Sequence, residues 1–246
     1  MSAIDSTATL GSLVAERSAR ASLFERLHLD YCCGGAQTLA QACAERGLDV
    51  ETVRTVLEAL DADTPDSRSF GEVDLRRVSL EELCAHIVAT HHDGLRSELP
   101  RIDELLSRTV RVHAASHPEL RDLERSFNTI RTRLEPHLQS EEEVLFPACV
   151  ALELGGTAIE DGLIAAHEHD HQDVGESLAA LRELADGYDT SRALCGTHRA
   201  LLEALAALER GLHQHIHEEN NVLLVRARKL NERAHPAREE RAGQDE

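Results

Sequence analysis

Apolar residues recur every three or four positions along most of this chain, which is the period of an amphipathic α-helix. After Ser79, a predicted N-cap, four long helical patterns cover residues 80–114, 118–149, 158–186 and 190–230. The breaks between them fall at His117-Pro118, Gly155-Gly156 and Gly187. Four helices with short connections predict an up-down-up-down bundle. Pro100 and Pro136 fall inside two patterns and predict a kink or a brief break in each.

Four shorter helical patterns precede the bundle, between Leu10 and Asp61, with Asp49 as the N-cap of the last. Their apolar positions are Leu13, Val14, Leu23, Phe24, Leu27, Leu39, Ala42, Cys43, Val53, Val56, Leu57 and Leu60. Residues 1–9 are small and polar and are predicted to fray. The expected organisation is a small helical domain over 1–60, a linker over 61–76, the bundle over 77–230 and a charged, disordered tail over 231–246.

Two polar residues interrupt the apolar stripe of the second long helix. His137 and Glu141 are four residues apart and so share one helical face. The apolar members of that face are Ile130, Leu134, Val144 and Leu145. His215 and Glu219 repeat the pattern in the last helix, beside Leu208, Leu212, Val222 and Leu223. An imidazole and a carboxylate in such a stripe cost free energy unless something satisfies them, and a metal ion would do so.

The other two long helices each contribute a candidate histidine. In the third, His171 shares its stripe with Ile164, Val174, Leu178 and Leu181, while His169 lies on a polar face and His167 one turn before His171. In the first, periodicity does not separate His91 from His92. The histidines expected at the surface or in loops are His28, His113, His117, His198, His213, His217 and His235.

The candidate set is therefore one histidine from each of four helices and a carboxylate from two of them. Four imidazoles and two carboxylates are too many ligands for one tetrahedral zinc. They suit two metals bridged by carboxylates, with iron favoured by the nitrogen and oxygen ligands. One competing interpretation is a bundle whose histidines and glutamates face solvent, and another is a structural bundle with zinc or with no metal.

Composition and charge limit the classes of partner that the protein is expected to bind. The chain of 246 residues has no Trp, 2% aromatic residues and a formal charge of −19, typical of an all-α protein with an aliphatic core. The negative charge argues against nucleic acid and anionic membranes as partners. The sequence shows neither a signal-peptide pattern nor an apolar stretch long enough to span a bilayer, so a cytoplasmic location is expected.

Cys32 and Cys33 are adjacent, whereas the other four cysteines lie in apolar helical contexts. A disulfide between neighbouring cysteines would close a strained ring and be easily reduced. Gly34-Gly35 follows, so the pair is expected at an exposed turn that opens a helix, where the pKa of a thiol falls. The hypothesis is a redox or metal-transfer pair.

Several of these stretches resemble the hemerythrin-like iron–sulfur cluster repair di-iron proteins of the ScdA/YtfE type, over about residues 10–229. Asp30 to Gly35 with Gln37-Thr38-Leu39 is similar to the N-terminal ScdA-type domain of that family. The bundle motifs are His91-His92 with Leu99-Pro100, His137-x3-Glu141 before Leu145-Phe146-Pro147, His171 before Gly175-Glu176, and His215-x3-Glu219-Asn220-Asn221. Two departures are Gln172 after His171 and Leu224-Val225 in place of the family's Phe-Pro.

The resemblance implies an all-α fold, a hemerythrin-like four-helix bundle after a small helical domain. It implies two non-haem irons, oxo- and carboxylate-bridged, on the ligands His92, His137, Glu141, His171, His215 and Glu219. It further implies repair of iron–sulfur clusters damaged by oxidative or nitrosative stress, by iron delivery or by nitric oxide (NO) reduction at the di-iron centre. The expected partners are damaged client proteins and NO or O2, and a homodimer is left open. The alternative is an O2, NO or iron sensor without turnover.

Overall fold

The computed structural model describes residues 4–63 and 74–234, and over these ranges it is helical without a strand. The described chain forms two compact units. One comprises Ala85–Leu145 and Ala165–His215, and the other comprises Met1–Cys84, Phe146–Ile164 and Ile216–Glu246. No helix in the described part is long and apolar enough to cross a membrane.

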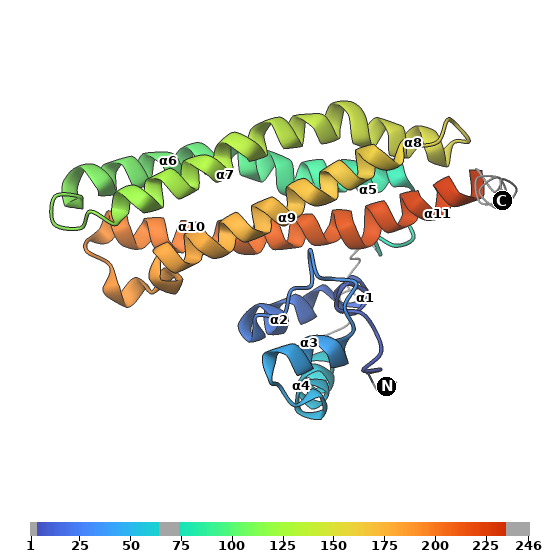
Figure 1. Cartoon of the computed structure of the whole chain (residues 1–246), viewed down its shortest axis with the longest axis horizontal. Coiled ribbons are helices and arrows are strands. Elements are labelled where there is room, and N and C mark those ends of the chain that lie inside the picture. The colour runs from blue at the N-terminus through green and yellow to red at the C-terminus, as the bar shows by residue number, and fades with distance from the viewer. Residues whose placement is uncertain (1–3, 64–73, 235–246) are drawn as a thin grey trace, which may run out of the picture. The chain divides into compact units, whose positions relative to one another are not determined.

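The first unit is the middle of a four-helix bundle. Its long helices are α6 (Asp93–His113), α7 (Leu120–Ser140), and most of α9 (Asp161–Leu184) and α10 (Gly196–Glu218). They lie side by side and alternate in direction, so the predicted up-down-up-down bundle is confirmed (Figure 1). The hydrophobic part of its interior is mostly aliphatic and includes Leu99, Ile102, Leu106, Phe127, Ile130, Leu178, Leu181, Leu205 and Leu212.

In three of the four bundle helices, two α-helical segments are joined by one wider turn of π-helix. These turns are η3 (Val88–His92), η4 (Glu141–Leu145) and η7 (Glu219–Leu223). The adjoining segments are α5 (Leu80–Ile87), α8 (Phe146–Glu153) and α11 (Leu224–Ala234). Of the kink or brief break predicted at Pro100 and Pro136, the break is wrong, because α6 and α7 run through both prolines. Buried neighbours on either side, such as Leu99 and Leu138, keep the helix packed where a proline removes one backbone hydrogen bond.

The N-terminal helices follow the predicted pattern closely. They are α1 (Leu10–Glu16), α2 (Ala21–Leu27), α3 (Leu39–Arg46) and α4 (Val50–Asp63), with the one-turn η1 (Ser18–Arg20) before α2. Their core contains Leu10, Leu13, Phe24, Leu39, Cys43, Val53 and Leu57. The placement of Val56 in this core is wrong, since its side chain is 44% exposed. Asp49 caps α4 by accepting the Thr52 N–H at 2.9 Å, as predicted.

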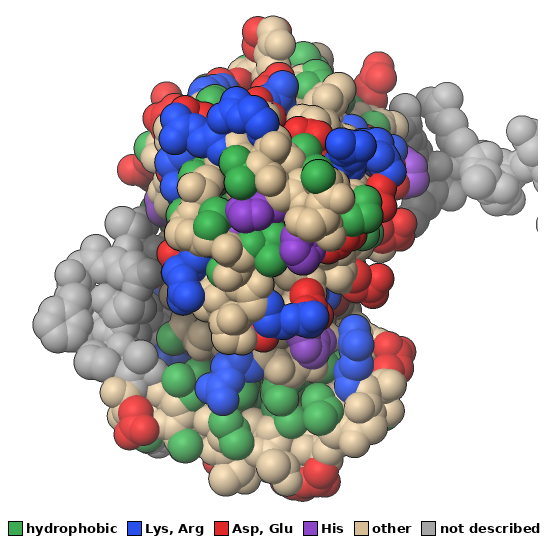
Figure 2. Space-filling model, turned by 90° about the vertical axis from the view of Figure 1, so that its left-hand side faces the viewer, with side chains coloured by type: hydrophobic (Ala, Val, Ile, Leu, Met, Phe, Trp, Pro, Cys, Tyr) green, Lys and Arg blue, Asp and Glu red, His purple; other side chains and the backbone are tan. Residues whose placement is uncertain are grey.

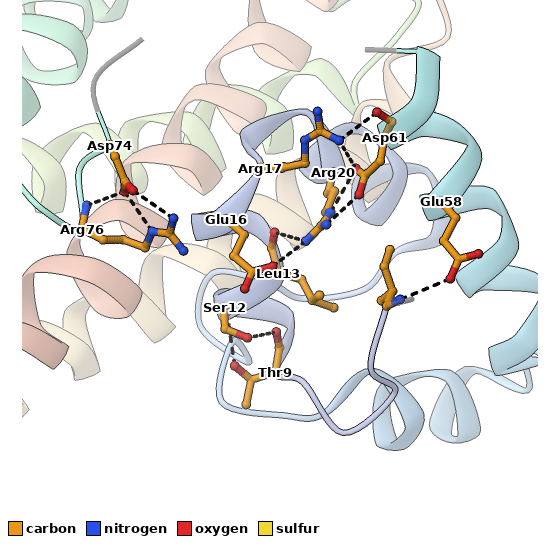
Figure 3. Close-up of polar contacts among 11 residues, drawn as sticks. Thr9, Ser12, Leu13, Glu16, Arg17, Arg20, Glu58, Asp61, Asp74 and Arg76 are labelled. Carbon is orange, nitrogen blue, oxygen red and sulfur yellow. Dashed lines mark hydrogen bonds and ion pairs between the residues drawn. The ribbon is translucent and has the colours of Figure 1, made fainter. Parts of the chain in front are cut away.

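Buried charges tie these short helices together. Figure 3 shows Arg17 and Arg20 converging on Asp61 of α4. The Arg20 guanidinium donates to Asp61 Oδ2 at 2.7 Å and to the Leu13 carbonyl at 2.9 Å, which joins α1 to the end of α4. Ile4 is buried and Thr9 caps α1, so the fraying predicted over 1–9 is wrong for residues 4–9.

The structure describes the start of α5 and the end of α11, the two ends of the bundle segment. Ser79 and Glu82 cap α5 reciprocally, as the N-cap prediction requires. Residues 64–73 of the expected linker and 235–246 of the expected tail lie outside the described residues. The tail prediction is wrong for 231–234, which continue α11. Asn231 holds that helix end by accepting from the Ile159 N–H and donating to the Ile159 carbonyl, both at 2.9 Å.

Candidate metal centre

Six buried side chains gather in the bundle interior as two groups that share both glutamates. The groups are His92, Glu141, His215 and Glu219, and His137, Glu141, His171 and Glu219. Within each group the ligand atoms lie within 4.8 Å of one another. The side chains range from fully buried to 6% exposed. The structure thus brings together every residue of the predicted ligand set.

The four histidines form two pairs, and within each pair the two Nε2 atoms face each other. His92 Nε2 lies 3.1 Å from His215 Nε2, and His137 Nε2 lies 3.0 Å from His171 Nε2. Glu141 spans the pairs, with Oε1 2.9 Å from His137 Nε2 and Oε2 3.5 Å from His92 Nε2. Each carboxylate oxygen is therefore aimed at a different histidine pair.

This donor set fits two metal ions. Two imidazole nitrogens that share a metal at right angles, at a metal–nitrogen distance of about 2.1 Å, are separated by about 3.0 Å. The Nε2 separations in both pairs match that span. A carboxylate with one oxygen toward each pair is arranged to bridge two ions, and nitrogen with oxygen ligands is a set that iron accepts.

Three of the candidate ligands lie at the ends of the π turns. His92 ends η3, Glu141 begins η4 and Glu219 begins η7. A π turn inserts one residue into the helical register and is frequently found at functional sites. Sequence periodicity assumes uniform 3.6-residue turns, so it does not signal these wider turns. It also misplaced Val144, which follows Glu141 in η4 and is 49% exposed.

The structure distinguishes His92 from His91. His92 is fully buried with its Nε2 in the ligand group, whereas the His91 ring stacks on His215 at a centroid distance of 5.2 Å. On α9, His171 lies in the group while His169 is exposed, as predicted. His167, one turn before His171, is buried with its ring 5.3 Å from that of His137.

The second ring nitrogen of His92, Nδ1, contacts a carboxylate outside the ligand group. Its Nδ1 lies 2.6 Å from Glu142 Oε1, and Arg96 donates to the same oxygen at 2.6 Å. Burial of Glu142 raises the pKa of its carboxyl, but the hydrogen bonds from His92 and Arg96 outweigh it and the net pKa is lowered. An ionised Glu142 fixes the His92 tautomer with Nδ1 protonated and Nε2 directed at the metal position.

Two histidines expected at the surface are buried, which corrects the prediction for His198 and His217. His198 accepts the Leu194 N–H at its Nδ1 at 3.1 Å. The His217 ring lies 5.5 Å from the ring of Tyr31, and its Nδ1 lies 3.3 Å from the Tyr31 carbonyl oxygen. Tyr31 lies 186 residues from His217 in the sequence, so the local pattern held no signal for the burial of that ring.

The adjacent cysteines lie in a bend before α3. Cys32 is buried, Cys33 is half-buried, and neither forms a disulfide. The predicted exposed turn opening a helix is therefore wrong, because α3 begins at Leu39. The hydrogen bond with Cys33 and the burial of Cys32 raise the pKa of its thiol, the opposite of the predicted shift.

Asn221 of η7 holds the backbone at this bend. Its Nδ2 donates to the carbonyls of Tyr31 and Cys32 at 3.2 Å and 2.9 Å. Gly11 and Gly35 line the slot that admits the side chain, since a Cβ at either position would lie 2.2 Å from Asn221 Oδ1. The segment carrying the cysteines is thus anchored two residues from Glu219.

Comparison with known proteins matches two family models and several full-length relatives. Residues 84–227 match the hemerythrin HHE cation binding domain, and residues 6–61 match the ScdA_N model, described as a domain of unknown function. An iron-sulfur cluster repair protein YtfE of Edwardsiella ictaluri is 35% identical over 218 residues, 89% of this chain and 95% of the relative. Similar proteins of the same name occur in Pectobacterium atrosepticum, 32% identical over 89% of this chain and 96% of the relative, and in Escherichia coli O6:K15:H31, 33% identical over 89% and 95%.

Proposed function

This chain belongs to the hemerythrin HHE cation-binding family, within the group of iron–sulfur cluster repair proteins, and we propose that it repairs damaged iron–sulfur clusters with a di-iron centre in its bundle. The observation that carries the proposal is the convergence of four imidazoles and two carboxylates in a buried site. The relatives match along nearly their whole length, including the N-terminal domain, which supports the same overall function.

His92 and His215 would hold one iron and His137 and His171 the other, and Glu141 and Glu219 belong to both ligand groups. Iron held there would supply the chemistry of binding small ligands such as NO or O2. The protein supplies the rest. The bundle core excludes bulk water from the site, Glu142 orients His92, and the spacing of the histidine pairs fixes where each ion sits.

Repair is favoured over a sensor without turnover because the relatives are named as repair proteins and because the cysteine pair lies beside η7. We propose damaged iron–sulfur proteins as clients, NO or O2 as ligands of the irons, and the cytoplasm as the site of action. The domain division proposed is an N-terminal helical domain that ends with α4 at Asp63, a linker, and the bundle from residue 77 to the end of α11 at Ala234. The choice between iron delivery and NO reduction is decided by experiment.

The direct test is restoration of a client enzyme with an oxidatively damaged cluster by the iron-loaded protein. Glu141→Ala removes the side chain that spans both histidine pairs and is expected to abolish restoration. Glu143→Ala is the matched control, because Glu143 lies exposed in the same π turn and is expected to leave restoration unchanged. Equal restoration by the Glu141→Ala protein would contradict the proposal.

The cysteine pair is tested separately, as a redox or metal-transfer element. Replacement of Cys32 and Cys33 by Ala is expected to slow restoration of the damaged client while the bundle keeps its iron. If the double variant restores the client at the wild-type rate, the pair has no part in repair.

A further inference from the structure

A second group of metal-ligating side chains lies outside the bundle interior. Asp30, Cys32 and Cys33 each place a ligand atom within 4.8 Å of the others. The three residues belong to the bend before α3, so the group is formed by one short segment. The proposed bundle centre uses none of them.

The spacing of the two sulfurs suits a shared metal ion. Cys32 Sγ and Cys33 Sγ are 3.9 Å apart. Two thiolates on one tetrahedral ion, at metal–sulfur distances of about 2.3 Å, are separated by about 3.8 Å. Asp30 Oδ1 lies 3.2 Å from Cys32 Sγ, so a carboxylate is placed at the same position.

The segment is held in this arrangement by its own backbone. Asp30 Oδ1 accepts the N–H groups of Cys32 and Cys33 at 3.1 Å and 2.9 Å. Gly34 allows this close packing, because a Cβ there would lie 3.1 Å from Asp30 Oδ2 and 3.0 Å from the Asp30 carbonyl oxygen. Asn221 holds the carbonyl of Cys32 from the other side. Ligands fixed in this way lose little conformational freedom when an ion binds.

Solvent reaches this group of three side chains from one side. Cys32 is buried, Cys33 is half-buried and Asp30 is exposed. An ion would therefore enter along the Asp30 and Cys33 side and keep a coordination position toward solvent. Three protein ligands with one open position are the pattern of a site that exchanges its ion or a further ligand.

We propose that Asp30, Cys32 and Cys33 form a second metal site, which binds a thiophilic divalent cation such as Zn²⁺ or Fe²⁺ through two thiolates and one carboxylate. Binding releases the protons of the two thiols to solvent and forms two metal–sulfur bonds. The existence of this site is independent of cluster repair. Its role, holding iron on the way to or from the bundle, rests on the proposed function.

The test is titration of the reduced, iron-loaded, full-length protein with Cd²⁺, followed by thiolate-to-cadmium charge-transfer absorption. We expect a band that saturates at about one Cd²⁺ per chain, since one pair of thiolates is involved. Cys33→Ser should abolish the band. Asp30→Asn, which retains an oxygen to accept the two N–H groups, should weaken Cd²⁺ binding by at least about tenfold. Cys195→Ser, a half-buried cysteine elsewhere, is the matched control and should leave the band unchanged.

Two results would overturn the proposal: a wild-type protein without the band, or a Cys33→Ser protein that retains it. The His171→Ala variant separates this site from the bundle centre. It is expected to lose bundle iron and keep the cadmium band, so either site can fail without the other.

Discussion

Three consecutive glutamates in η4 show how position within one turn decides the role of a carboxylate. Glu141 is fully buried and faces both histidine pairs, and Glu142 contacts the outer nitrogen of His92. Glu143 is exposed and accepts only a hydrogen bond from Gln139 among the contacts described. The π turn separates these roles because it changes the angle between successive side chains.

Glu142 is predicted to orient His92 without binding metal itself. Glu142→Gln removes the charge that holds His92 with Nδ1 protonated, so iron affinity is expected to fall by about tenfold or more. Competition with a chelator measures that affinity, and Glu143→Gln is the control on the same turn. Equal iron affinity in the two variants would show that the hydrogen bond has no orienting role.

His198 is predicted to make folding sensitive to acid. Burial, with smaller contributions from His113 and His117, lowers the pKa of His198 below its ordinary value of 6.5. The unfolded chain then binds this proton more readily, so the free energy of unfolding falls as the pH drops through 6.5 toward the folded pKa. His198→Asn keeps an acceptor for the Leu194 N–H and should lessen that loss. Denaturant titrations at pH 7 and pH 5 measure it, and an unchanged pH dependence would refute the assignment.

At the scale of single residues, the sequence located the candidate ligands well and their surroundings less well. His137, His171 and His215 follow from periodicity because each lies on an apolar stripe of a regular helix. His92 required the family resemblance, since His91 shares much of the same apolar face. The burial of His217 was missed because Tyr31, which packs on it, is 186 residues away.

At the scale of elements, the bundle helices were predictable because glycine and proline mark their ends and their apolar stripes are long. The π turns were not predictable, since the apolar pattern continues through them. π turns are frequently found at functional sites, and η3, η4 and η7 coincide with the candidate ligands His92, Glu141 and Glu219. The breaks expected at the prolines are absent because packing holds α6 and α7 together around Pro100 and Pro136.

The contact between η7 and the cysteine bend yields a prediction about stability. Gly35→Ala places a Cβ 2.2 Å from Asn221 Oδ1 and is expected to lower the free energy of unfolding by about 1–3 kcal/mol. Asn221→Ala alone should also destabilise, through loss of two hydrogen bonds. The double variant should be more stable than the sum of the two single effects predicts, because the clash is gone. Thermal denaturation of the wild type, the two single variants and the double variant measures these stability changes. Strictly additive changes would contradict a steric clash between a Cβ at residue 35 and Asn221.

At the scale of the whole molecule, charge sets the range of partners. The formal charge of −19 predicts weak binding to nucleic acid and to anionic membranes. Figure 2 shows one face, on which Lys and Arg side chains lie among histidines and hydrophobic side chains and Asp and Glu side chains lie mostly toward the edges.

The bundle and the N-terminal helices followed from the sequence because both are built from local patterns. The link between Asn221 and the cysteine bend did not, because no local pattern records which distant segments meet. The whole account depends on one claim, that four imidazoles and two carboxylates in the bundle interior bind two iron ions.

Iron counting with Mössbauer spectroscopy on the wild type, His171→Ala and His169→Ala tests that claim most directly. The two substitutions remove histidines from the same helix, one within the ligand group and one exposed. The account predicts about two coupled irons per chain in the wild type and in His169→Ala, by the carboxylate-bridged arrangement of four-helix bundles. It predicts loss of the coupled signal in His171→Ala. A His171→Ala protein that keeps both irons and their coupling would contradict it.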